Sequence, residues 1–338
     1  MLGESRAGGT WPAPLAPGSA MRIFTGAPLP EGADSVIAQE DTRPDGERVA
    51  FFFAPRPGHH VRARGSDVLA GKPLLPRGHG VRAASVALLA SQGIAEVRVY
   101  RRPIVSVLCS GDELRAISDP PRPGSIINSN LYALLAAIEE AGAIPRALPT
   151  APDDLASLRG HVADALRGAD LVITTGAVSV GAHDHMRAAF DHAGIEQRLW
   201  KVRIKPGKPL AFGLAGDVPV VGLPGNPVSA LVTFELFVRP GLRRMLGDPR
   251  PFPRLFDVRI EHAHRHGPGR DELARGRLDS SGSSVTLFRD QGSAAVAGSA
   301  LADVLVLLPA DRETFEAGER VRALGLVDRS STETCPFG

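Results

Sequence analysis

The stretch Ile104-Val-Ser-Val-Leu-Cys109, followed at once by Ser110-Gly-Asp-Glu113, decides the fold. A nearly continuous apolar run is typical of a strand that is buried on both faces of a parallel sheet. The glycine after the strand allows backbone amides to approach a ligand, and the two acids could bind Mg²⁺ or ligand hydroxyls. Acids at the start of a helix also occur without a ligand, because they complement the helix dipole, so this segment alone leaves both readings open.

Helix and strand patterns alternate after this first strand. A helix capped by Asn128 or Ser129 ends at Gly142, and residues 152–154 open a second helix. The alternation predicts an α/β fold, a doubly wound and mostly parallel sheet, over residues 103–247. The strands expected are 104–109, 170–175, 199–204, 209–212 and 218–221, and the helices are 128–142, 152–168, 184–192 and 227–246.

Short apolar runs between Pro, Gly and Asp turns lie on both sides of the α/β region. They predict small β domains, the second of them a barrel or sandwich. In between, residues 81–93 have the pattern of a helix and 96–100 that of a strand, and these two elements need a further partner. The short strands expected are 35–38, 49–53 and 60–62, and later 255–260, 285–288, 304–308 and 320–323.

The charge and cysteine content exclude several classes of protein. Lys and Arg number 39 and Asp and Glu 37, so the formal net charge of +2 gives no global attraction to nucleic acid or to a membrane surface. Neither a signal-peptide pattern nor a run of about 18 apolar residues is present. Cys109 and Cys335 are far apart, which indicates a reducing compartment, with the cytoplasm as the expected location.

Three further loops follow predicted strands and carry groups that suit a bound anion. Residues 174–184 combine hydroxyls and glycines in a connection that is long enough to wrap a phosphate. Lys205 and Lys208 flank a Pro-Gly turn, so both ammonium groups can converge on phosphate, sulfate or molybdate. Residues 222–229 lead from a strand into a helix with Asn226 as N-cap, which leaves amides free for a ligand.

Each loop also has an ordinary explanation: a long connection, a solvated basic turn or good helix capping. Four such loops at one edge of a single sheet nevertheless favour a site for a phosphorylated ligand, because ligands of doubly wound sheets bind beyond the strand ends. Nucleophile-elbow and dinucleotide-binding motifs are missing from the sequence, and His59, His60, His183 and His185 lack partners at zinc-binding spacing. Hydrolase, dehydrogenase and zinc-protein readings are therefore disfavoured.

Taken together, these motifs resemble those of the molybdopterin molybdenumtransferase family, which includes MoeA and the gephyrin E domain. The resemblance extends over nearly the whole chain, because the flanking regions also match the family's inserted and C-terminal β domains. The segments that carry it are Cys109–Leu114, Ile127–Asn130, Thr174–Asp184, Ile204–Pro209, Gly222–Ala230, Met21–Ala33, Arg64–Asp67, Gly269–Glu272 and Gln291–Ala294.

The resemblance implies a MoeA/MogA-like molybdopterin-binding domain that inserts molybdate into adenylated molybdopterin, with Mg²⁺ assisting the loss of AMP. Carried over by position, the molybdate site would comprise Lys205, Lys208, Ser229, Arg270 and Ser293. The catalytic residues would be Asp112, Asp184, Lys205 and Lys208, and the two aspartates would hold Mg²⁺. The pterin and nucleotide would contact Thr25, Ser110, Gly111, Asp112, Glu113, Thr175, Gly176, Ser179, Gly181, Pro224, Gly225, Asn226 and Pro227.

The resemblance also predicts a homodimer whose cleft lies between subunits, so that Thr25 and Arg64 would serve the site of the partner subunit. Molybdopterin adenylyltransferase would be the pathway partner. The domains expected are 1–20, a linker or remnant of an N-terminal dimerisation domain; 21–69, an inserted β domain; 70–102, the remainder of the dimerisation domain; 103–247, the α/β domain; 248–326, a barrel-like β domain; and 327–338, a disordered tail.

Several features depart from the family pattern. Ala177 stands where a second glycine is usual, Ala182 where an acid is frequent, and Asp303 where Asn is frequent. The family's Met-Asp-Gly-Tyr-Ala motif is missing, which predicts a truncated or misassigned start, or a paralogue lacking half of the dimerisation domain. Two alternatives therefore stay open: a non-catalytic pterin-binding or scaffold protein, and the related molybdopterin adenylyltransferase.

Overall fold

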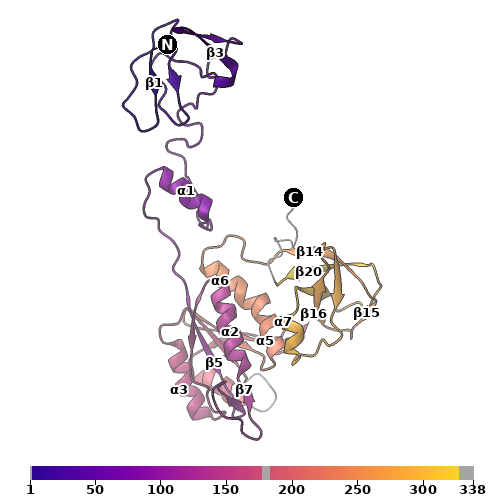
Figure 1. Ribbon diagram of the computed structural model, residues 1–338. Helices are drawn as coiled ribbons and strands as arrows, with labels where there is room; N and C mark the ends of the chain where they lie inside the picture. Colours follow the sequence, from indigo (N-terminus) through magenta and orange to yellow (C-terminus); the bar gives the residue numbers. More distant parts are fainter. Residues whose placement is uncertain (1, 177–182, 327–338) are drawn as a thin grey trace. The chain divides into compact units, whose positions relative to one another are not determined.

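The computed structural model describes residues 2–176 and 183–326, except for the side chains of His183 and Asp184. The chain divides into two compact units, residues 1–76 with 83–93 and residues 77–82 with 94–338 (Figure 1). The predicted site residues Ser179 and Gly181, and the departures at Ala177 and Ala182, lie outside the described residues. The domain boundaries expected from the sequence stay predictions.

The first unit is built from short elements. A parallel pair of two-residue strands and one hairpin provide its regular backbone pairing, and loops rich in Pro and Gly make up most of the rest. Such short strands leave most side chains partly exposed. The elements are β1 (Glu4–Ser5) with β2 (Arg22–Ile23), a 3-10 turn η1 (Gln39–Asp41), β3 (Thr42–Asp45) with β4 (Arg48–Phe51), and the helix α1 (Ala83–Ser91).

The strands expected at 35–38 and 60–62 are wrong. The two segments do lie side by side, and Val36 N–H donates to His59 O at 2.8 Å, but they form no regular ladder. Pro57 and Gly58 precede the second segment, and both residue types disfavour a continuing strand.

The strand expected at 96–100 is also wrong, whereas the helix before it is confirmed as α1. No strand in the described part of the chain pairs with this segment. Val97 and Val99 are 46% and 70% exposed, so the alternating pattern has no core to face. An isolated extended segment has no neighbouring backbone to bond and is not stable as a strand.

The second unit contains a six-stranded sheet with the order β10-β12-β13-β9-β5-β8. Strands β13, β9, β5 and β8 run parallel, and two antiparallel pairings extend one edge, β12 with β13 and β10 with β12. The doubly wound α/β fold expected from the sequence is thus confirmed. The strands are β5 (Ile104–Cys109), β8 (Ile144–Ala147), β9 (Leu171–Thr175), β10 (Glu196–Trp200), β12 (Ala211–Ala215) and β13 (Val218–Leu223), and a small pair is formed by β6 (Leu114–Arg115) and β7 (Ile126–Ile127).

Helices cover both faces of this sheet. Those expected from the sequence are confirmed, and Asn128 caps its helix by accepting a hydrogen bond from Leu131 N–H at 3.2 Å. The last helix of the α/β domain contains a π-helical segment between two α-helical parts. The helices are α2 (Ser129–Glu140), α3 (Leu155–Leu166), α4 (His183–His192), α5 (Pro227–Thr233), η2 (Phe234–Val238) and α6 (Arg239–Met245).

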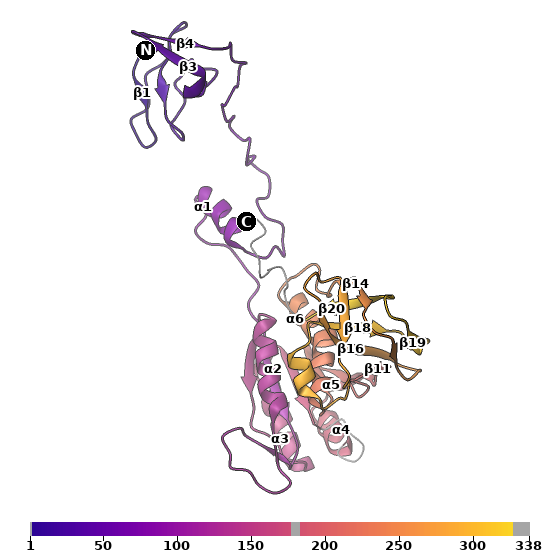
Figure 2. The same cartoon turned by 45° about the vertical axis from the view of Figure 1, so that its right-hand side comes forward.

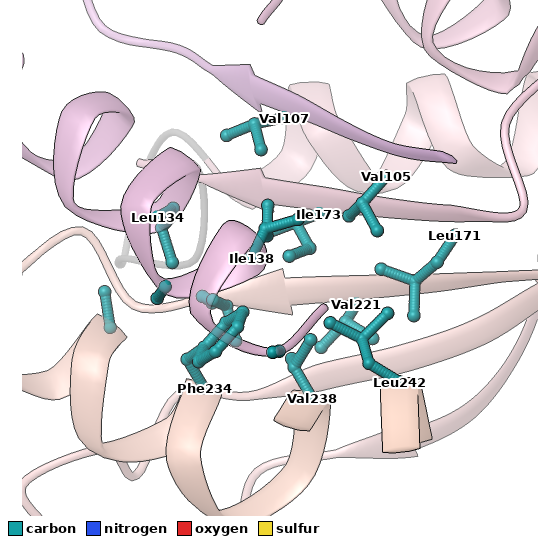
Figure 3. Packing of buried hydrophobic residues seen from close by; sticks show 14 of the residues in the cluster. Val105, Val107, Leu134, Ile138, Leu171, Ile173, Val221, Phe234, Val238 and Leu242 are labelled. Carbon is teal, nitrogen blue, oxygen red and sulfur yellow. The ribbon is translucent and has the colours of Figure 1, made fainter. Parts of the chain in front are cut away.

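Alternate side chains of β5 enter two separate cores. Val105 and Val107 pack with Ile138 of α2 and with residues of α5, η2 and α6, as Figure 3 shows. Leu108 points the other way, into a core with side chains of α3 and α4. A strand whose side chains are buried on both faces explains the near-continuous apolar run of the sequence.

The C-terminal part forms a closed barrel, because β16 pairs with both β17 and β18, and β14 and β20 complete the ring. Figure 2 shows its strands beside α5 and α6. The barrel and neighbouring elements are β14 (Leu255–Ile260), β15 (His264–Arg265), β16 (Asp271–Leu278), β17 (Ser284–Leu287), α7 (Val296–Ala300), β18 (Val304–Leu308), β19 (Thr314–Phe315) and β20 (Arg320–Gly325).

One short strand links the α/β domain to the barrel. The strand expected at 199–204 is displaced: β10 ends at Trp200, and the chain forms β11 (Ile204–Lys205) only after a break. β11 pairs in parallel with β16 of the barrel, with Lys205 opposite Glu272. The predicted lysine turn therefore begins on the barrel sheet and not on the α/β sheet.

No helix in the described residues is both long and apolar enough to cross a membrane.

Candidate active site

The strand order places a switch point between β5 and β9. The connection after β5 leads to β8 on one side, and the next connection returns to β9 on the other side of β5. Cys109 and Thr175 are register partners at the carboxyl ends of these two strands. Ligands of doubly wound folds bind in the crevice that opens at this place, so the carboxyl ends of β5 and β9 meet at the edge expected from the sequence.

The loop after β5 is tied to the neighbouring strand ends. Ser110 N–H donates to Thr175 O at 3.0 Å, and Gly111 N–H donates to Ala151 O at 3.2 Å. These two amides are therefore occupied by the protein itself. Gly111 has a φ of +150°, a backbone conformation that residues with a side chain rarely adopt, so the loop holds this shape because residue 111 is glycine.

Three carboxylates gather beside this loop. Asp112 Oδ1 accepts from Asp153 N–H at 3.2 Å, and both Asp112 and Glu113 are exposed. Burial raises the pKa of Asp153, and the charges of Asp112 and Glu113 raise it further. The sequence marked Asp153 only as part of a helix start. Asp154 caps α3 by accepting from Ser157 N–H at 2.9 Å, and a helix needs only one capping acid. The additional acid before it, Asp153, was therefore the signal in the sequence for a role other than capping.

The described residues hold no cluster of three or more His, Cys, Asp or Glu side chains arranged to bind a metal. Mg²⁺ does not need such a cluster, because it commonly takes one or two carboxylates together with substrate phosphates and water. Exposed Asp112 fits that role, whereas Asp184, near the start of α4, has no described side chain.

Asn130 joins the ends of β9 and β13. Its Nδ2 donates to Thr175 Oγ1 at 3.2 Å and to Gly225 O at 2.6 Å, and the Thr175 hydroxyl donates to Pro224 O at 2.9 Å. Asn130 Oδ1 is buried and has no hydrogen-bond partner among the described residues. The network fixes the loop after β13 against the strand end that precedes Gly176.

The loop after β13 also contacts the barrel. Asn226 is the N-cap residue of α5, as expected, but its side chain makes no capping bond and instead donates from Nδ2 to Ser293 Oγ at 2.8 Å. Ser293 O accepts from Val228 N–H at 3.1 Å. Ser293, a predicted molybdate residue, therefore lies at the start of α5. One of the helix amides that the sequence left free for a ligand is occupied by it.

The lysine turn packs against the same helix. A Cβ at Gly207 would lie 2.6 Å from Thr233 Cγ2, which shows how closely the turn approaches α5. Thr233 in turn donates to the carbonyl of Ser229, which is 4% exposed. Lys208 is exposed, whereas Lys205 Nζ lies 3.2 Å from Glu272 Oε1 of β16. The turn, the start of α5 and the barrel loop thus form one seam, defined here by Lys205–Lys208, Asn226–Ser229 and Ser293.

Not every predicted residue is brought to this seam by a contact. Arg270 is exposed, one residue before β16. Pro227 starts α5, half-buried. Thr25 and Arg64 belong to the first compact unit. That they serve the site of a partner subunit stays a prediction.

Arg275 of β16 holds the barrel loop that carries Ser293. The side chain is 1% exposed, and its guanidinium donates to Asp290 O and Gly292 O at 3.0 Å each and to Ala295 O at 2.6 Å. Gln291 Oε1 accepts from Arg275 N–H at 2.9 Å. Sequence reasoning missed Arg275, because an arginine in a polar stretch is usually exposed.

Cys109 has a structural place only. The thiol is 1% exposed at the end of β5 and belongs to the core that α2 covers. Burial raises the pKa of Cys109 to about 11, so the group is a neutral thiol at physiological pH and a poor nucleophile.

The doubly wound domain with its switch point is an α/β protein of a known class, because residues 106–244 match the family described as a probable molybdopterin binding domain. Residues 2–93 match the MoeA N-terminal region (domain I and II), and 258–326 match the MoeA C-terminal region (domain IV). Molybdopterin molybdenumtransferase 2 of Mycobacterium tuberculosis is 36% identical over 92% of this chain and 78% of its own length. The chain belongs to the molybdopterin molybdenumtransferase, or MoeA, family.

Other relatives agree with this assignment. The molybdopterin molybdenumtransferase of a Nostoc species is 38% identical over 76% of this chain, which corresponds to 60% of the Nostoc protein. The crystal structure of a molybdopterin biosynthesis MoeA protein from Pyrococcus horikosii is 30% identical, with a TM-score of 0.82 over 97% of this chain and 81% of that one. This likeness in structure covers the flanking β regions as well as the α/β domain.

Proposed function

We propose that the chain inserts molybdate into adenylated molybdopterin with release of AMP, as a molybdopterin molybdenumtransferase of molybdenum cofactor biosynthesis. The observation that carries the proposal is the seam, where Lys205, Lys208 and Ser293 lie beside α5. Gly225 connects the seam to the switch point, because a Cβ on Gly225 would touch Gly176 Cα at 3.5 Å. A phosphorylated pterin in the crevice and an oxyanion at the seam would therefore be neighbours.

The residues have distinct roles in this proposal. Molybdate is a dianion, and charge-assisted hydrogen bonds from Lys205, Lys208 and Arg270 would bind it, with Ser229 and Ser293 adding hydroxyls. The phosphates of the pterin nucleotide would lie over Gly176 and the turn at 224–227, where the lack of bulk permits a close approach. Mg²⁺ held by Asp112 would neutralise charge on these phosphates and make AMP a better leaving group.

The test is molybdate-dependent release of AMP from adenylated molybdopterin, followed by chromatography. Lys208→Ala is expected to weaken molybdate binding by about 1.5–3 kcal/mol, because one charge-assisted hydrogen bond is lost. Lys201→Ala is the matched control, since Lys201 is an exposed lysine of the preceding loop outside the seam. Unchanged molybdate affinity in Lys208→Ala would show that Lys208 is a solvated surface residue and does not bind the anion.

The same assay separates the alternative functions. Tight binding of adenylated molybdopterin without AMP release at any molybdate concentration would favour a non-catalytic pterin-binding or scaffold protein. Consumption of ATP with molybdopterin would instead favour an adenylyltransferase. The matches to both MoeA flanking regions support the insertion reaction over the adenylyltransferase.

The proposal includes a homodimer. The helix α1 has the sequence AASVALLAS, yet only Ser85 of it is buried, and Val86 is 54% exposed. A helix that is apolar on nearly all sides is normally covered, and a second copy of the chain would cover it.

We expect light scattering to give the mass of two 35.6 kDa chains for the wild type and of one chain for Val86→Glu. Ile117→Glu, at a 64% exposed site of the α/β domain, should stay dimeric. A monomeric wild-type chain would contradict the proposal.

Two further elements of the proposal follow from the reaction itself. Adenylated molybdopterin must be supplied by an enzyme that adenylylates molybdopterin, so molybdopterin adenylyltransferase is the proposed pathway partner. The cytoplasm is the proposed location, supported by the free thiol of Cys109.

A further inference from the structure

Lys205 is one half of an ion pair whose other half is buried. The parallel pairing of β11 with β16 places Lys205 opposite Glu272, and Lys205 Nζ lies 3.2 Å from Glu272 Oε1. The side chain of Glu272 is 2% exposed, whereas that of Lys205 is 41% exposed. The ammonium group can thus reach a ligand at the surface of the seam, and the carboxylate cannot leave the interior.

The second oxygen of Glu272 has no fixed partner. Oε2 accepts no hydrogen bond from the described residues, and Nδ1 of the buried His266 lies 3.5 Å away. His264 is no substitute for a cation, because burial lowers its pKa. The guanidinium of Arg275, on the same strand, is engaged with the barrel loop. Among the lysines and arginines of the described residues, Lys205 is therefore the one that forms an ion pair with Glu272.

We propose that Glu272 is a positioning residue of the oxyanion site: it anchors the Lys205 ammonium and offsets part of its charge, so that molybdate is held loosely enough to be transferred. This inference rests on the proposed function, in which Lys205 binds molybdate. Lys208, which is exposed, then supplies the uncompensated positive charge. Binding of the anion requires Lys205 to share its ammonium between Glu272 and the ligand.

The physical reason is electrostatic. A buried carboxylate lies in a medium of low dielectric, where its attraction for the ammonium group of Lys205 at 3.2 Å is stronger than in water. Removing its charge leaves the full charge of Lys205 to the anion, so ground-state binding becomes tighter. An interaction that stabilises the bound anion without stabilising the transition state does not raise the turnover rate. Loss of the anchor also allows the Lys205 side chain to move, which lowers turnover.

The experiment compares molybdate affinity, measured by calorimetry on the full chain, with the turnover of AMP release. Glu272→Gln keeps the shape and removes the charge, and we expect molybdate to bind about 10-fold more tightly while kcat falls about 10-fold, an affinity change of about 1.4 kcal/mol. A residue with a purely structural role would weaken binding and turnover together. Glu313→Gln removes a carboxylate of the same barrel that pairs with exposed Arg265, and should change neither quantity.

A second pair of variants guards against misfolding and tests the link to Lys205. Glu272→Asp keeps the buried charge but shortens its reach, so molybdate affinity should stay within about threefold of wild type while kcat falls. In the background of Lys205→Gln, Glu272→Gln should no longer tighten binding. Thermal unfolding checks that each variant is folded. If Glu272→Gln does not fold, Glu272→Asp tests the proposal by itself: a lower kcat with molybdate affinity within about threefold of wild type supports it, and an equal loss of both contradicts it.

The outcomes separate this inference from the proposed function. If wild type binds molybdate and releases AMP but Glu272→Gln binds it with unchanged or weaker affinity, the positioning role is overturned and the function stands. If the effect of Glu272→Gln persists without Lys205, the proposed link between the two residues is overturned. If neither wild type nor any variant binds molybdate, the proposed function itself is overturned, and the inference with it.

Discussion

Replacing Arg275 by methionine is expected to lower the free energy of unfolding by about 3–5 kcal/mol, because a buried charged hub is lost and its acceptors stay behind. The guanidinium satisfies the carbonyls of Asp290, Gly292 and Ala295, and the side chain is only 1% exposed. Methionine fills part of the volume but donates nothing. Buried carbonyl groups without donors carry a desolvation penalty of about 1–3 kcal/mol each, reduced where water can enter.

The matched control lies two residues away on the same strand. Arg277 is exposed, so Arg277→Met removes the same charge from β16 at little structural cost, within about 0.5 kcal/mol. Arg275→Lys should behave almost as badly as the methionine variant, because an ammonium group cannot reproduce the planar fork that serves several carbonyls at once. Chemical denaturation of the three variants measures the difference.

Arg275 also connects stability to the proposed site. The loop that it holds carries Ser293, whose carbonyl and hydroxyl meet Val228 and Asn226 at the start of α5. If Arg275 orders this loop, the folded fraction of Arg275→Met should bind molybdate more weakly than wild type at a temperature where both are folded. Equal losses of stability in Arg275→Met and Arg277→Met would contradict the hub role.

The α/β part of the fold could be predicted because its signals are local. The apolar run at 104–109 needs cover on both faces whatever lies around it, and caps such as Asn128 and Asp154 act within one helical turn. Motif order along the chain then places the ends of β5, β9 and β13 at one sheet edge, whereas the lysine turn, which the sequence expected at the same edge, begins on the barrel sheet. These features depend on residues that are close together in the chain, so they can be recognised from a single sequence.

The barrel strand β16 was missed for the opposite reason. Its sequence DELARGRL reads as polar, yet Glu272 and Arg275 in it are buried. Each is compensated by partners from distant segments, Lys205 of β11 and the loop at 290–295. A periodic pattern of apolar residues cannot reveal a strand whose buried face is partly charged.

The candidate site shows the same division. Sequence motifs predicted the loops at the switch point and the lysine turn, but not the residues that hold them, Asn130, Asp153 and Glu272. Those roles depend on contacts between strands and helices far apart in the chain. The strand expected at 96–100 failed because periodicity was read without knowing whether a neighbour would pair with it.

Gly176→Ala is expected to be the most damaging single-methyl change at the switch point. Gly176 has a φ of +108°, and a Cβ built there would lie 2.1 Å from the carbonyl oxygen of Ser110 and 3.1 Å from its carbonyl carbon. The obstacle is backbone, so a side-chain rotation cannot relieve it. Ser110 itself is fixed to Thr175 through its amide, which means that the clash must separate the carboxyl ends of β5 and β9.

The cost has two parts that a control can separate. Alanine at a left-handed φ costs about 1 kcal/mol at an open position, and Gly194→Ala, at a φ of +68° with nothing within 4 Å, measures this part alone. Overpacking against fixed backbone adds about 1–3 kcal/mol or more. We therefore expect Gly176→Ala to lose about 3 kcal/mol of unfolding free energy against about 1 kcal/mol for Gly194→Ala.

Function should suffer more than stability in Gly176→Ala. Gly225 packs against Gly176 where the proposed pterin phosphates would lie, so strand ends displaced by the clash of the added methyl group with Ser110 would distort this space. Binding of adenylated molybdopterin, followed by fluorescence or calorimetry below the unfolding transition, should fall by at least tenfold, or about 1.4 kcal/mol. Gly194→Ala should bind normally. Normal binding by folded Gly176→Ala would show that the ligand does not approach the end of β9, and would move the pterin site away from the switch point.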